Sequence, residues 1–499
     1  MAVSFNAIPA GNGIRVPLFY AEMDNAQANY PSETQKTLLI GQKTKATAGT
    51  PYLIGSYDEA KDIFGVGSML AQMVKFYRLQ DPVGELWCLA VLDDADGVKA
   101  TGTIEVGGTA LVAGTIALYI AGQKITVGVA DDDTANEVAA AINVAINAAN
   151  DLPVVSTVST DTVTIECLWK GLTGNDITVV HSFRGTAGGE GLPGGLTLTI
   201  SGSGKLTGGT TAPDFTSALL NMGDDAYDFI IHPYTDTDSL DTFQTEMNES
   251  AGRWAWSRQV FGHVYTALRG SSSALVTAGT ARNDAHNTIA AIDSDCQNPS
   301  WEYAAAYGGR NAVFIKADPA RPTQTGALVG LLAPRQGRKF SFTNRNTLLS
   351  SGIATSAVVA GQLQIERAIT TYQVNAYDQA DISYLDSETL HTAAYVLRYL
   401  RGVITSKYPR HKLADDGTRY APGQAIVTPL VIRGELLAAY KQLESLGIVE
   451  NFDAFNEHLI VERDTTNANR VNVLFPPDYV NQLRVFAVLN QFRLQYQAA

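Results

Sequence analysis

The sequence predicts a multidomain α/β (α+β) protein in which a mostly-β domain is inserted into an α/β domain. Three observations lead to this class. The chain has 499 residues, and at roughly 100–200 residues per domain this length suggests about three domains. Short apolar runs alternate with helical patterns in residues 33–95 and again from residue 213. Between these stretches, residues 97–211 contain only five Lys or Arg residues and are rich in Gly and Thr.

In residues 33–95 and 213–345, expected strands alternate with expected helices, as in a single α/β domain. Ser56, followed by Asp58 and Glu59, has the composition of a helix N-terminus. The expected strands are 37–41, 85–92, 227–232 and 259–268, and the expected helices are about 56–64, 68–79, 215–222 and 239–250. Because insertions are tolerated at exposed loop tips, we expect the two stretches to form one domain that the segment 97–211 interrupts.

The segment 97–211 is predicted to be the inserted mostly-β domain, because short alternating runs recur along it. These runs are 101–106, 115–120, 124–129, 154–158, 162–167, 177–180 and 196–200. One helix is expected at 134–150, where Thr134 and Glu137 have the spacing of a capping box.

Residues 346–479 are predicted to form a C-terminal domain with two helices and a hairpin. The first helix, 387–407, has Leu390, Ala394, Leu397 and Ile404 on its apolar face and is closed by Pro409. The second begins at Thr428 and Pro429, ends at Gly447, and carries the stripe Ile432, Leu436, Ala439, Leu443 and Leu446. The hairpin is expected to pair 458–463 with 470–475.

Both ends of the chain, residues 1–32 and 480–499, are predicted to be extended arms. Pro31 separates the first from its domain, and Pro476 and Pro477 separate the second. The residues expected to form inter-subunit strands are Val3, Phe5, Ile14, Val16, Leu483, Val485, Ala487 and Leu489. The alternative is that each end completes its own domain. A lone hairpin at 458–475 offers an edge that such an arm would cover.

A basic run begins inside the first C-terminal helix and continues beyond its end. It contains Arg398, Arg401, Lys407, Arg410 and Lys412 without an acidic residue between them. Such a run is suited to an acidic partner surface. The alternative is a solvated helix end whose cations favour the C-terminal dipole.

Composition and motifs exclude several functional classes. The formal charge is −14, whereas nucleic-acid binders usually carry a basic face. The three cysteines lie far apart without a CxxC pair, which fits free thiols in a reducing cytosol. No signal peptide and no apolar stretch of about 18 residues is found. The chain is therefore expected to be made in the cytoplasm and to stay soluble until it meets partners.

No catalytic, cofactor-binding or metal-ligating residues are predicted. The sequence contains no GxSxG or Walker motif and no HxxxH or HExxH pair. A dinucleotide site would show GxGxxG between a strand and a helix, and Gly65-Val66-Gly67 lacks the third glycine and follows a helix. The run 131–133 is acidic, but it lacks the alternating oxygen ligands of an EF-hand and favours the N-terminus of the helix that follows.

From about residue 170 to 499 the chain resembles Mu-like phage tail sheath proteins. The residues that carry the resemblance are 361–372 (GQLQIERAITTY), 443–451 (LESLGIVEN) and 470–486 (RVNVLFPPDYVNQLRVF). Residues 171–177 (GLTGNDI) and 225–234 (DAYDFIIHPY) are also similar to the family. The order and spacing of these motifs make the resemblance specific.

The resemblance implies a virion subunit, made in the host cytoplasm, that stacks as rings around a tail tube and contracts to drive the tube through the host envelope. It implies an inner α/β part built from both chain ends, outer inserts, and linking arms. The implied partners are further copies of the chain, the tail tube protein, and the baseplate and tail terminator proteins. The resemblance implies no cofactor, no nucleic acid and no membrane insertion, and it makes the basic run a candidate for the tube-facing surface.

Two other functions compete with this interpretation. One is a different virion component, such as a tube, baseplate or capsid protein. The other is a glycan-degrading enzyme that uses paired carboxylates, although the acidic residues are too loosely placed to nominate a pair.

Overall fold

The computed structural model describes residues 35–47, 49–421 and 423–494. These residues form two compact units. The larger unit comprises residues 35–396, 440–459 and 475–494, and the smaller comprises residues 397–439 and 460–474.

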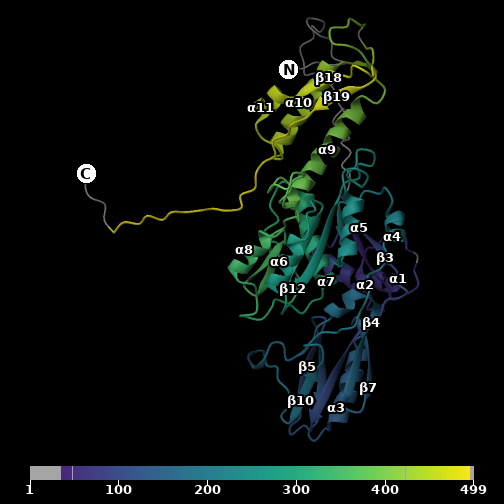
Figure 1. Ribbon diagram of the computed structural model, residues 1–499, viewed down its shortest axis with the longest axis vertical. Helices are drawn as coiled ribbons and strands as arrows, with labels where there is room; N and C mark the ends of the chain where they lie inside the picture. The colour runs from purple at the N-terminus through teal and green to yellow at the C-terminus, as the bar shows by residue number, and fades with distance from the viewer. Residues whose placement is uncertain (1–34, 48, 422, 495–499) are drawn as a thin grey trace, which may run out of the picture. The chain divides into compact units, whose positions relative to one another are not determined.

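The larger unit is built around a six-stranded sheet with the order β13-β12-β11-β1-β3-β2. Figure 1 labels two of its strands, β3 and β12. The strands are β1 (Thr37–Gln42), β2 (Tyr52–Leu53), β3 (Leu86–Val91), β11 (Phe229–Ile231), β12 (His263–Gly270) and β13 (Asn287–Asp293). Neighbouring strands are parallel, except that β2 runs antiparallel to β3. Thr37 of β1 lies opposite Leu86 on one side and Phe229 on the other. Strands from before and after residues 97–211 therefore pair directly.

Helices bury this sheet. β1 and β13 are buried along their whole length, as a continuous apolar run predicts for a parallel strand covered on both faces. Helices α2 (Met69–Arg78) and α7 (Ser300–Ala317) pack against each other and against β1 and β12, respectively. Ile289 of β13 belongs to a separate apolar cluster with Leu240, Leu275 and Leu348. These last three residues come from α5 (Thr237–Met247), α6 (Ser272–Thr280) and α8 (Phe342–Leu349).

Two further helices complete this part of the chain, α1 (Tyr57–Phe64) and α4 (Thr216–Met222). The predicted start of α1 is confirmed, because the Ser56 hydroxyl accepts a hydrogen bond from the Glu59 amide at 3.2 Å.

The predicted strand 259–268 is wrong at its start, because β12 begins only at His263 and continues to Gly270. Gln259 and Phe261 have φ values of 51° and 46°, and Gly262 has 110°. A left-handed backbone cannot join a strand ladder. The apolar run QVFGHVYTAL thus combines an irregular turn with a strand, which hydrophobicity alone does not separate.

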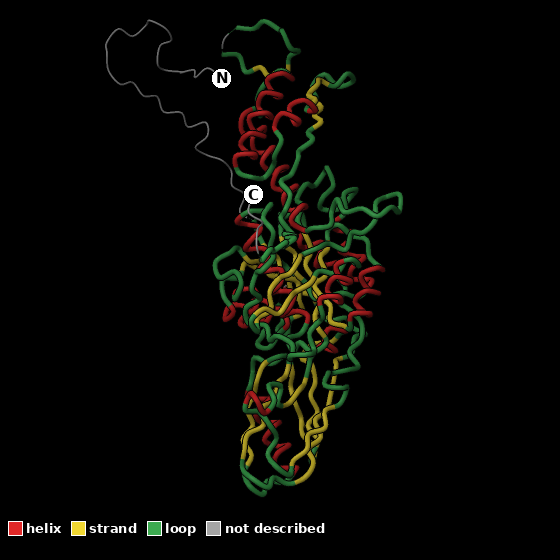
Figure 2. The backbone as a smooth tube through the Cα atoms, turned by 90° about the vertical axis from the view of Figure 1, so that its left-hand side faces the viewer, coloured by secondary structure: helices red, strands yellow, loops and turns green. Residues whose placement is uncertain are grey.

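Residues 97–211 form two sheets and one helix. The four-stranded sheet has the order β10-β4-β8-β7, and the three-stranded sheet has the order β6-β5-β9 (yellow strands at the lower end of Figure 2). The strands are β4 (Lys99–Gly108), β5 (Gly114–Ile120), β6 (Gln123–Val129), β7 (Val154–Ser159), β8 (Thr162–Lys170), β9 (Val179–His181) and β10 (Leu196–Ile200). Short 3-10 turns span Leu172–Asp176 and Thr186–Gly188. The predicted capping box at Thr134 and Glu137 is confirmed, and it opens α3 (Ala135–Ala148).

Residues beyond 345 continue the packing of the larger unit. The Ala354 amide donates to the Ile289 carbonyl at 2.9 Å, and the Ala291 amide donates to the Ala354 carbonyl at 2.8 Å. This segment then forms the hairpin β14 (Thr355–Val359) and β15 (Gln362–Arg367). Packing in the structure is therefore continuous across the predicted domain boundary at residue 345.

Helices α9 (Ser387–Lys407) and α10 (Pro429–Ser445) have the predicted bounds to within two residues. Their predicted apolar faces are buried at Leu390, Ala394 and Leu443, but Leu397 and Leu446 are 47% and 49% exposed. The apolar faces predicted from the sequence are therefore only partly covered. The sequence also did not predict helix α11 (Phe452–His458).

The smaller unit contains two short sheets. β16 (Lys412–Leu413) pairs in parallel with β17 (Ile426–Val427). β18 (Ile460–Arg463) and β19 (Val471–Leu474) form the predicted antiparallel hairpin, with Ile460 opposite Leu474.

Candidate assembly surfaces

The three cysteines and several histidines of the chain are buried. In the part of the chain that the structure describes, no three His, Cys, Asp or Glu side chains are grouped so that they could hold a metal ion. Cys88, Cys167 and Cys296 are buried, and burial raises the pKa of the Cys296 thiol to about 11. A protonated thiol is neither a nucleophile nor a metal ligand.

The buried histidines belong to the core. Burial lowers the pKa of His232 to about 3 and that of His286 to about 4. The His232 ring stacks on Phe243 with 4.0 Å between centroids, and His263 Nε2 lies 2.8 Å from the Thr288 hydroxyl. These contacts agree with packed histidines rather than with proton-transfer groups. No helix among the described residues is long and apolar enough to span a membrane.

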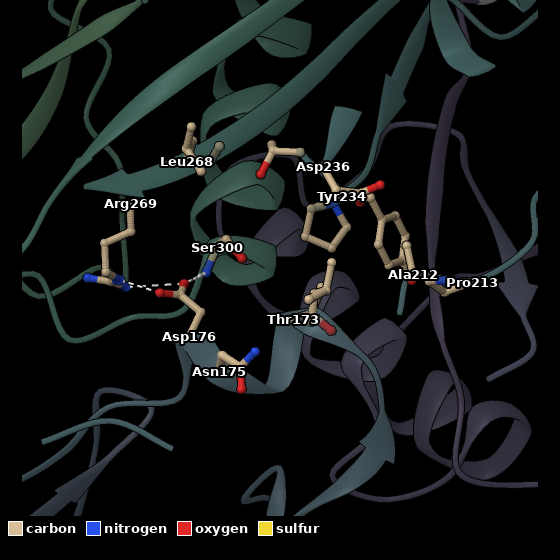
Figure 3. A pocket seen from close by; sticks show the side chains of 14 residues that line it. Thr173, Asn175, Asp176, Ala212, Pro213, Tyr234, Asp236, Leu268, Arg269 and Ser300 are labelled. Atoms are coloured by element: carbon tan, nitrogen blue, oxygen red, sulfur yellow. Dashed lines mark hydrogen bonds and ion pairs between the residues drawn. The ribbon is translucent and has the colours of Figure 1, made fainter. Parts of the chain in front are cut away.

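One pocket, of about 310 Å³, lies where the insert meets the carboxyl ends of β11 and β12 (Figure 3). Its lining includes Thr173 and Asp176 from the insert and Tyr234, Arg269 and Ser300 from the central sheet region. Asp176 and Arg269 face each other across this junction, and the Ser300 amide points at the same carboxylate. The polar groups at this end of the pocket are therefore already bound to one another.

The C-terminal segment presents the most extensive run of exposed apolar side chains in the described chain. Residues 480–494 form no helix or strand, and Figure 1 shows them as an extended trace. The predicted residues Leu483, Val485, Ala487 and Leu489 are all exposed, and Leu489 is 94% exposed. Phe486, Val488, Phe492 and Leu494 are exposed as well. Exposed apolar side chains at this density mark a surface for another protein.

Within the larger unit, Arg484 ties this segment to Asp386 and Glu388. One guanidinium nitrogen, Nη2, lies 3.1 Å from a carboxylate oxygen of Asp386 and 3.1 Å from one of Glu388. Glu388 is fully buried and also accepts the Thr323 amide and hydroxyl at 3.0 Å. The Asp386 carboxylate also accepts two hydrogen bonds from the Arg367 guanidinium, at 2.8 and 2.9 Å. Two arginines thus balance two carboxylates at the point where the exposed segment begins.

The sequence did not identify Arg484 as an anchor. In the sequence, Arg484 stands out only as a cation inside the apolar run LRVF. Its partners, Asp386 and Glu388, lie about 100 residues earlier in the chain. At the other end, the predicted arm residues Val3, Phe5, Ile14 and Val16 lie outside the described residues.

The hairpin β18–β19 has the exposed edges that the arm hypothesis requires. Within the described residues it is a two-stranded sheet. Ile460 and Leu474, which lie opposite each other, are both exposed. Isolated hairpins are marginally stable in water, so a further strand would stabilise this one.

The structure places the predicted basic run on α9 and the strand that follows it. Arg401, Arg410 and Lys412 are exposed, whereas Arg398 and Lys407 are partly buried. Lys407 pairs with Glu435 of α10 at 2.7 Å, and Lys412 lies 3.3 Å from the Gln424 side chain. Glu435 therefore neutralises Lys407 in the folded chain.

Comparisons with known proteins agree along the chain. Three family models match it: the phage tail sheath protein beta-sandwich domain at residues 95–211, the central domain at 208–371, and the tail sheath C-terminal domain at 379–493. The Mu-like prophage FluMu tail sheath protein of Haemophilus influenzae is 41% identical over 500 residues, which cover 99% of this chain and 100% of that protein.

Two of the solved structures that match the chain are also tail sheath proteins. The sheath tail protein of Desulfitobacterium hafniense has 12% identity and a TM-score of 0.48, covering 93% of this chain and 100% of its own. A sheath tail protein of Listeria innocua has 11% identity and a TM-score of 0.47, covering 91% and 94%.

Proposed function

The chain belongs to the phage tail sheath protein family, and we propose that it polymerises as stacked rings around a tail tube and contracts to drive the tube through a host envelope. The observation that carries this proposal is the full-length identity to a curated tail sheath protein. A lattice that is metastable when extended contracts without fuel at the moment of firing, which agrees with a chain that shows no nucleotide-binding motif.

Negative-stain electron microscopy of the purified protein tests this proposal. A sheath subunit forms hollow cylinders with an open lumen, alone or on added tail tubes. Solid filaments, closed shells or particles that never exceed a single subunit would contradict it.

The exposed C-terminal segment is proposed to connect neighbouring subunits by adding a strand to the hairpin β18–β19 of another copy. Backbone hydrogen bonds of this kind survive rotation of the domains that they join. The N-terminal residues 1–22 are proposed to act in the same way. Exposed apolar side chains at Leu489 and Ile460 support the C-terminal connection.

Engineered cysteines test the connection directly, because the three native cysteines are buried. Leu489→Cys combined with Ile460→Cys or with Leu474→Cys should give a ladder of covalent oligomers in oxidised cylinders. Leu489→Cys combined with Val144→Cys is the matched control, since Val144 is exposed on the insert. A ladder in the control alone would rule out strand addition at the hairpin.

The basic run is proposed to face an acidic tube. Complementary charge sets register without strong adhesion, which suits a sheath that must release its tube. Arg401→Glu with Arg410→Glu should weaken assembly on tubes more than assembly without tubes. Arg419→Glu, an exposed control in the same unit, should change neither. Equal losses with and without tubes would remove the tube-docking role.

The insert, residues 97–211, is proposed to be a separate domain on the outside of the cylinder. Direct pairing of β1 with β11 supports this, because the central sheet closes without the insert. Replacement of 97–211 by a short Gly/Ser linker should leave a protein that folds and polymerises, although Trp301 loses its cover. A variant that cannot fold would show that the insert is part of the core.

The role is proposed to be structural and not enzymatic, in a virion whose subunits are made in the host cytoplasm. The tail tube, baseplate and tail terminator proteins are the proposed partners beyond the sheath itself. A hydrolysis screen on cell-wall and capsule polymers tests the enzymatic alternative, and turnover above that of a buffer control would overturn the structural assignment.

A further inference from the structure

The central sheet has a crevice of the type that binds ligands in α/β proteins. From β1 the chain moves to β3 on one side, whereas β11, β12 and β13 follow on the other. The strand order therefore reverses between β1 and β11. In open parallel sheets, ligands bind outside the carboxyl ends of the strands next to such a reversal.

Here a loop of the insert covers these strand ends. Gln42, the last residue of β1, donates to the Lys170 carbonyl at 2.7 Å, and the Thr173 hydroxyl donates to the Gln42 side chain at 3.3 Å. The pocket beside this loop is lined by the residues that follow β11, including Tyr234, and by the end of β12. The insert thus occupies the position of a ligand.

The group at the centre of this contact is the Asp176 carboxylate, which ends the 3-10 turn Leu172–Asp176. One of its oxygens accepts from Arg269 Nε at 2.5 Å, and the other accepts the Ser300 amide at 2.7 Å. Ser300 is the first residue of α7, whose N-terminus carries a partial positive charge. A second cation, Lys205, has its Nζ 3.6 Å from the same carboxylate.

Arg269 belongs to the central sheet, and contacts other than Asp176 also hold its guanidinium. Its side chain is 3% exposed. Its guanidinium also donates to the carbonyls of Cys296 and Asn298, in the loop that leads into α7. A buried guanidinium and a helix N-terminus aimed at one point form an anion site.

We propose that the insert is bound to the central domain as an intramolecular ligand, with the Asp176 carboxylate filling an anion site made by Arg269 and the N-terminus of α7. The ligand class of this site is a small carboxylate. Asp176 is therefore a positioning residue, which fixes the insert on the sheet and closes the crevice to free anions.

Chemical rescue tests the proposal. Asp176→Ala keeps the Cβ atom and removes a group of the size of formate, and the adjoining pocket gives formate access. Hydrogen exchange at the Ser300 amide should be at least about tenfold faster in this variant, because a buried cation loses its partner. Sodium formate should restore the protection saturably, whereas sodium chloride at equal ionic strength should not. Exchange at the wild-type rate, or formate acting no better than chloride, would overturn the proposal.

Two further variants keep the test decisive if Asp176→Ala folds poorly. Asp176→Asn keeps the size but loses the charge, so Ser300 should exchange faster and formate should have no effect. An Asp176→Asn protein that exchanges at the wild-type rate would overturn the proposal. Glu166→Gln is the matched control, since it removes one carboxylate from a partly exposed pair with Lys99 inside the insert. It should leave Ser300 unchanged.

Discussion

The insert and the C-terminal segment attach to the central sheet in opposite ways. At the insert junction, Trp169 and Trp301 are both fully buried and meet edge to face at 5.1 Å. Hydrogen bonds also join the insert to the central region; for example, the Thr178 hydroxyl donates to the Gln297 carbonyl at 2.7 Å. The C-terminal segment is instead anchored at Arg484 and exposes its apolar side chains beyond it.

This difference separates two kinds of apolar surface in one chain. Side chains that are covered within the subunit contribute to its stability. Side chains that a single subunit leaves in water can contribute free energy only when another molecule covers them. The same residue types therefore serve folding at the junction and, in our proposal, assembly at the C-terminus.

The largest loss of stability is expected when the junction loses its central ring. Trp301→Ala removes a fully buried side chain and leaves Gln72 Oε1 without the indole donor that lies 2.7 Å away. The free energy of unfolding should fall by about 3–5 kcal/mol, as measured by urea denaturation. Trp256→Ala, at a residue that is 82% exposed, should change it by less than about 0.5 kcal/mol. Similar losses in both variants would show that the junction does not stabilise the subunit.

A smaller loss is expected at the anchor of the C-terminal segment. Arg484→Gln leaves the fully buried Glu388 with neutral donors only, so the free energy of unfolding should fall by about 3 kcal/mol. Arg463→Gln breaks a pair whose partner Asp415 is 75% exposed, and it should cost less than about 1 kcal/mol. If the Arg484→Gln protein were as stable as wild type, Arg484 would not anchor the C-terminal segment.

A pH-dependent difference is expected at Glu302, near the insert junction. Burial raises its pKa to about 8, so the folded protein holds a proton that the unfolded chain releases above about pH 4.5. Its contribution to stability is present below pH 4.5 and should be lost by about 1.4 kcal/mol per pH unit up to about pH 8. The Glu302→Gln variant should lack this loss, so the difference in free energy of unfolding between wild type and variant should change with pH. If the free energies of unfolding of wild type and Glu302→Gln changed in parallel from pH 5 to 8, Glu302 would not be a buried, protonated carboxyl.

The smallest effect on stability is expected from the segment itself. Deletion of residues 486–499 keeps Arg484 and should change the free energy of unfolding by less than about 0.5 kcal/mol. The same deletion should abolish cylinders in negative stain if the segment connects subunits. A sharp fall in stability with aggregation would mean that the segment completes its own subunit instead.

The helices and strands that the sequence predicted mostly formed, because their signals are local, but no element was predicted between residues 269 and 386, where β13, α6, α7, α8, β14 and β15 lie. Ser56 and Thr134 cap the helices that their positions predicted, and the alternating runs of the insert became strands. The start of β12 was not predictable, because Gln259 and Phe261 are apolar-run residues held in left-handed conformations by tertiary packing. Leu397 and Leu446 belong to the apolar stripes of their helices but are 47% and 49% exposed, so the stripe alone did not show which of its positions are buried.

The candidate surfaces were predictable only in part. The alternation of Leu483, Val485, Ala487 and Leu489 pointed to the C-terminal segment, but it left out Phe486 and Phe492, which are equally exposed. Arg484 and Asp176 were missed because their partners are distant in sequence. A basic run could be read from residues 398–412, whereas the neutralisation of Lys407 by Glu435 needed the fold.

A helical reconstruction of assembled cylinders by cryo-electron microscopy tests the central claim most directly. The account predicts that residues 485–494 leave their own subunit and lie as a strand beside β18 or β19 of a neighbour, with Arg484 still bound to Glu388. Residues 485–494 folded back onto their own subunit, with no strand added to the hairpin, would contradict it.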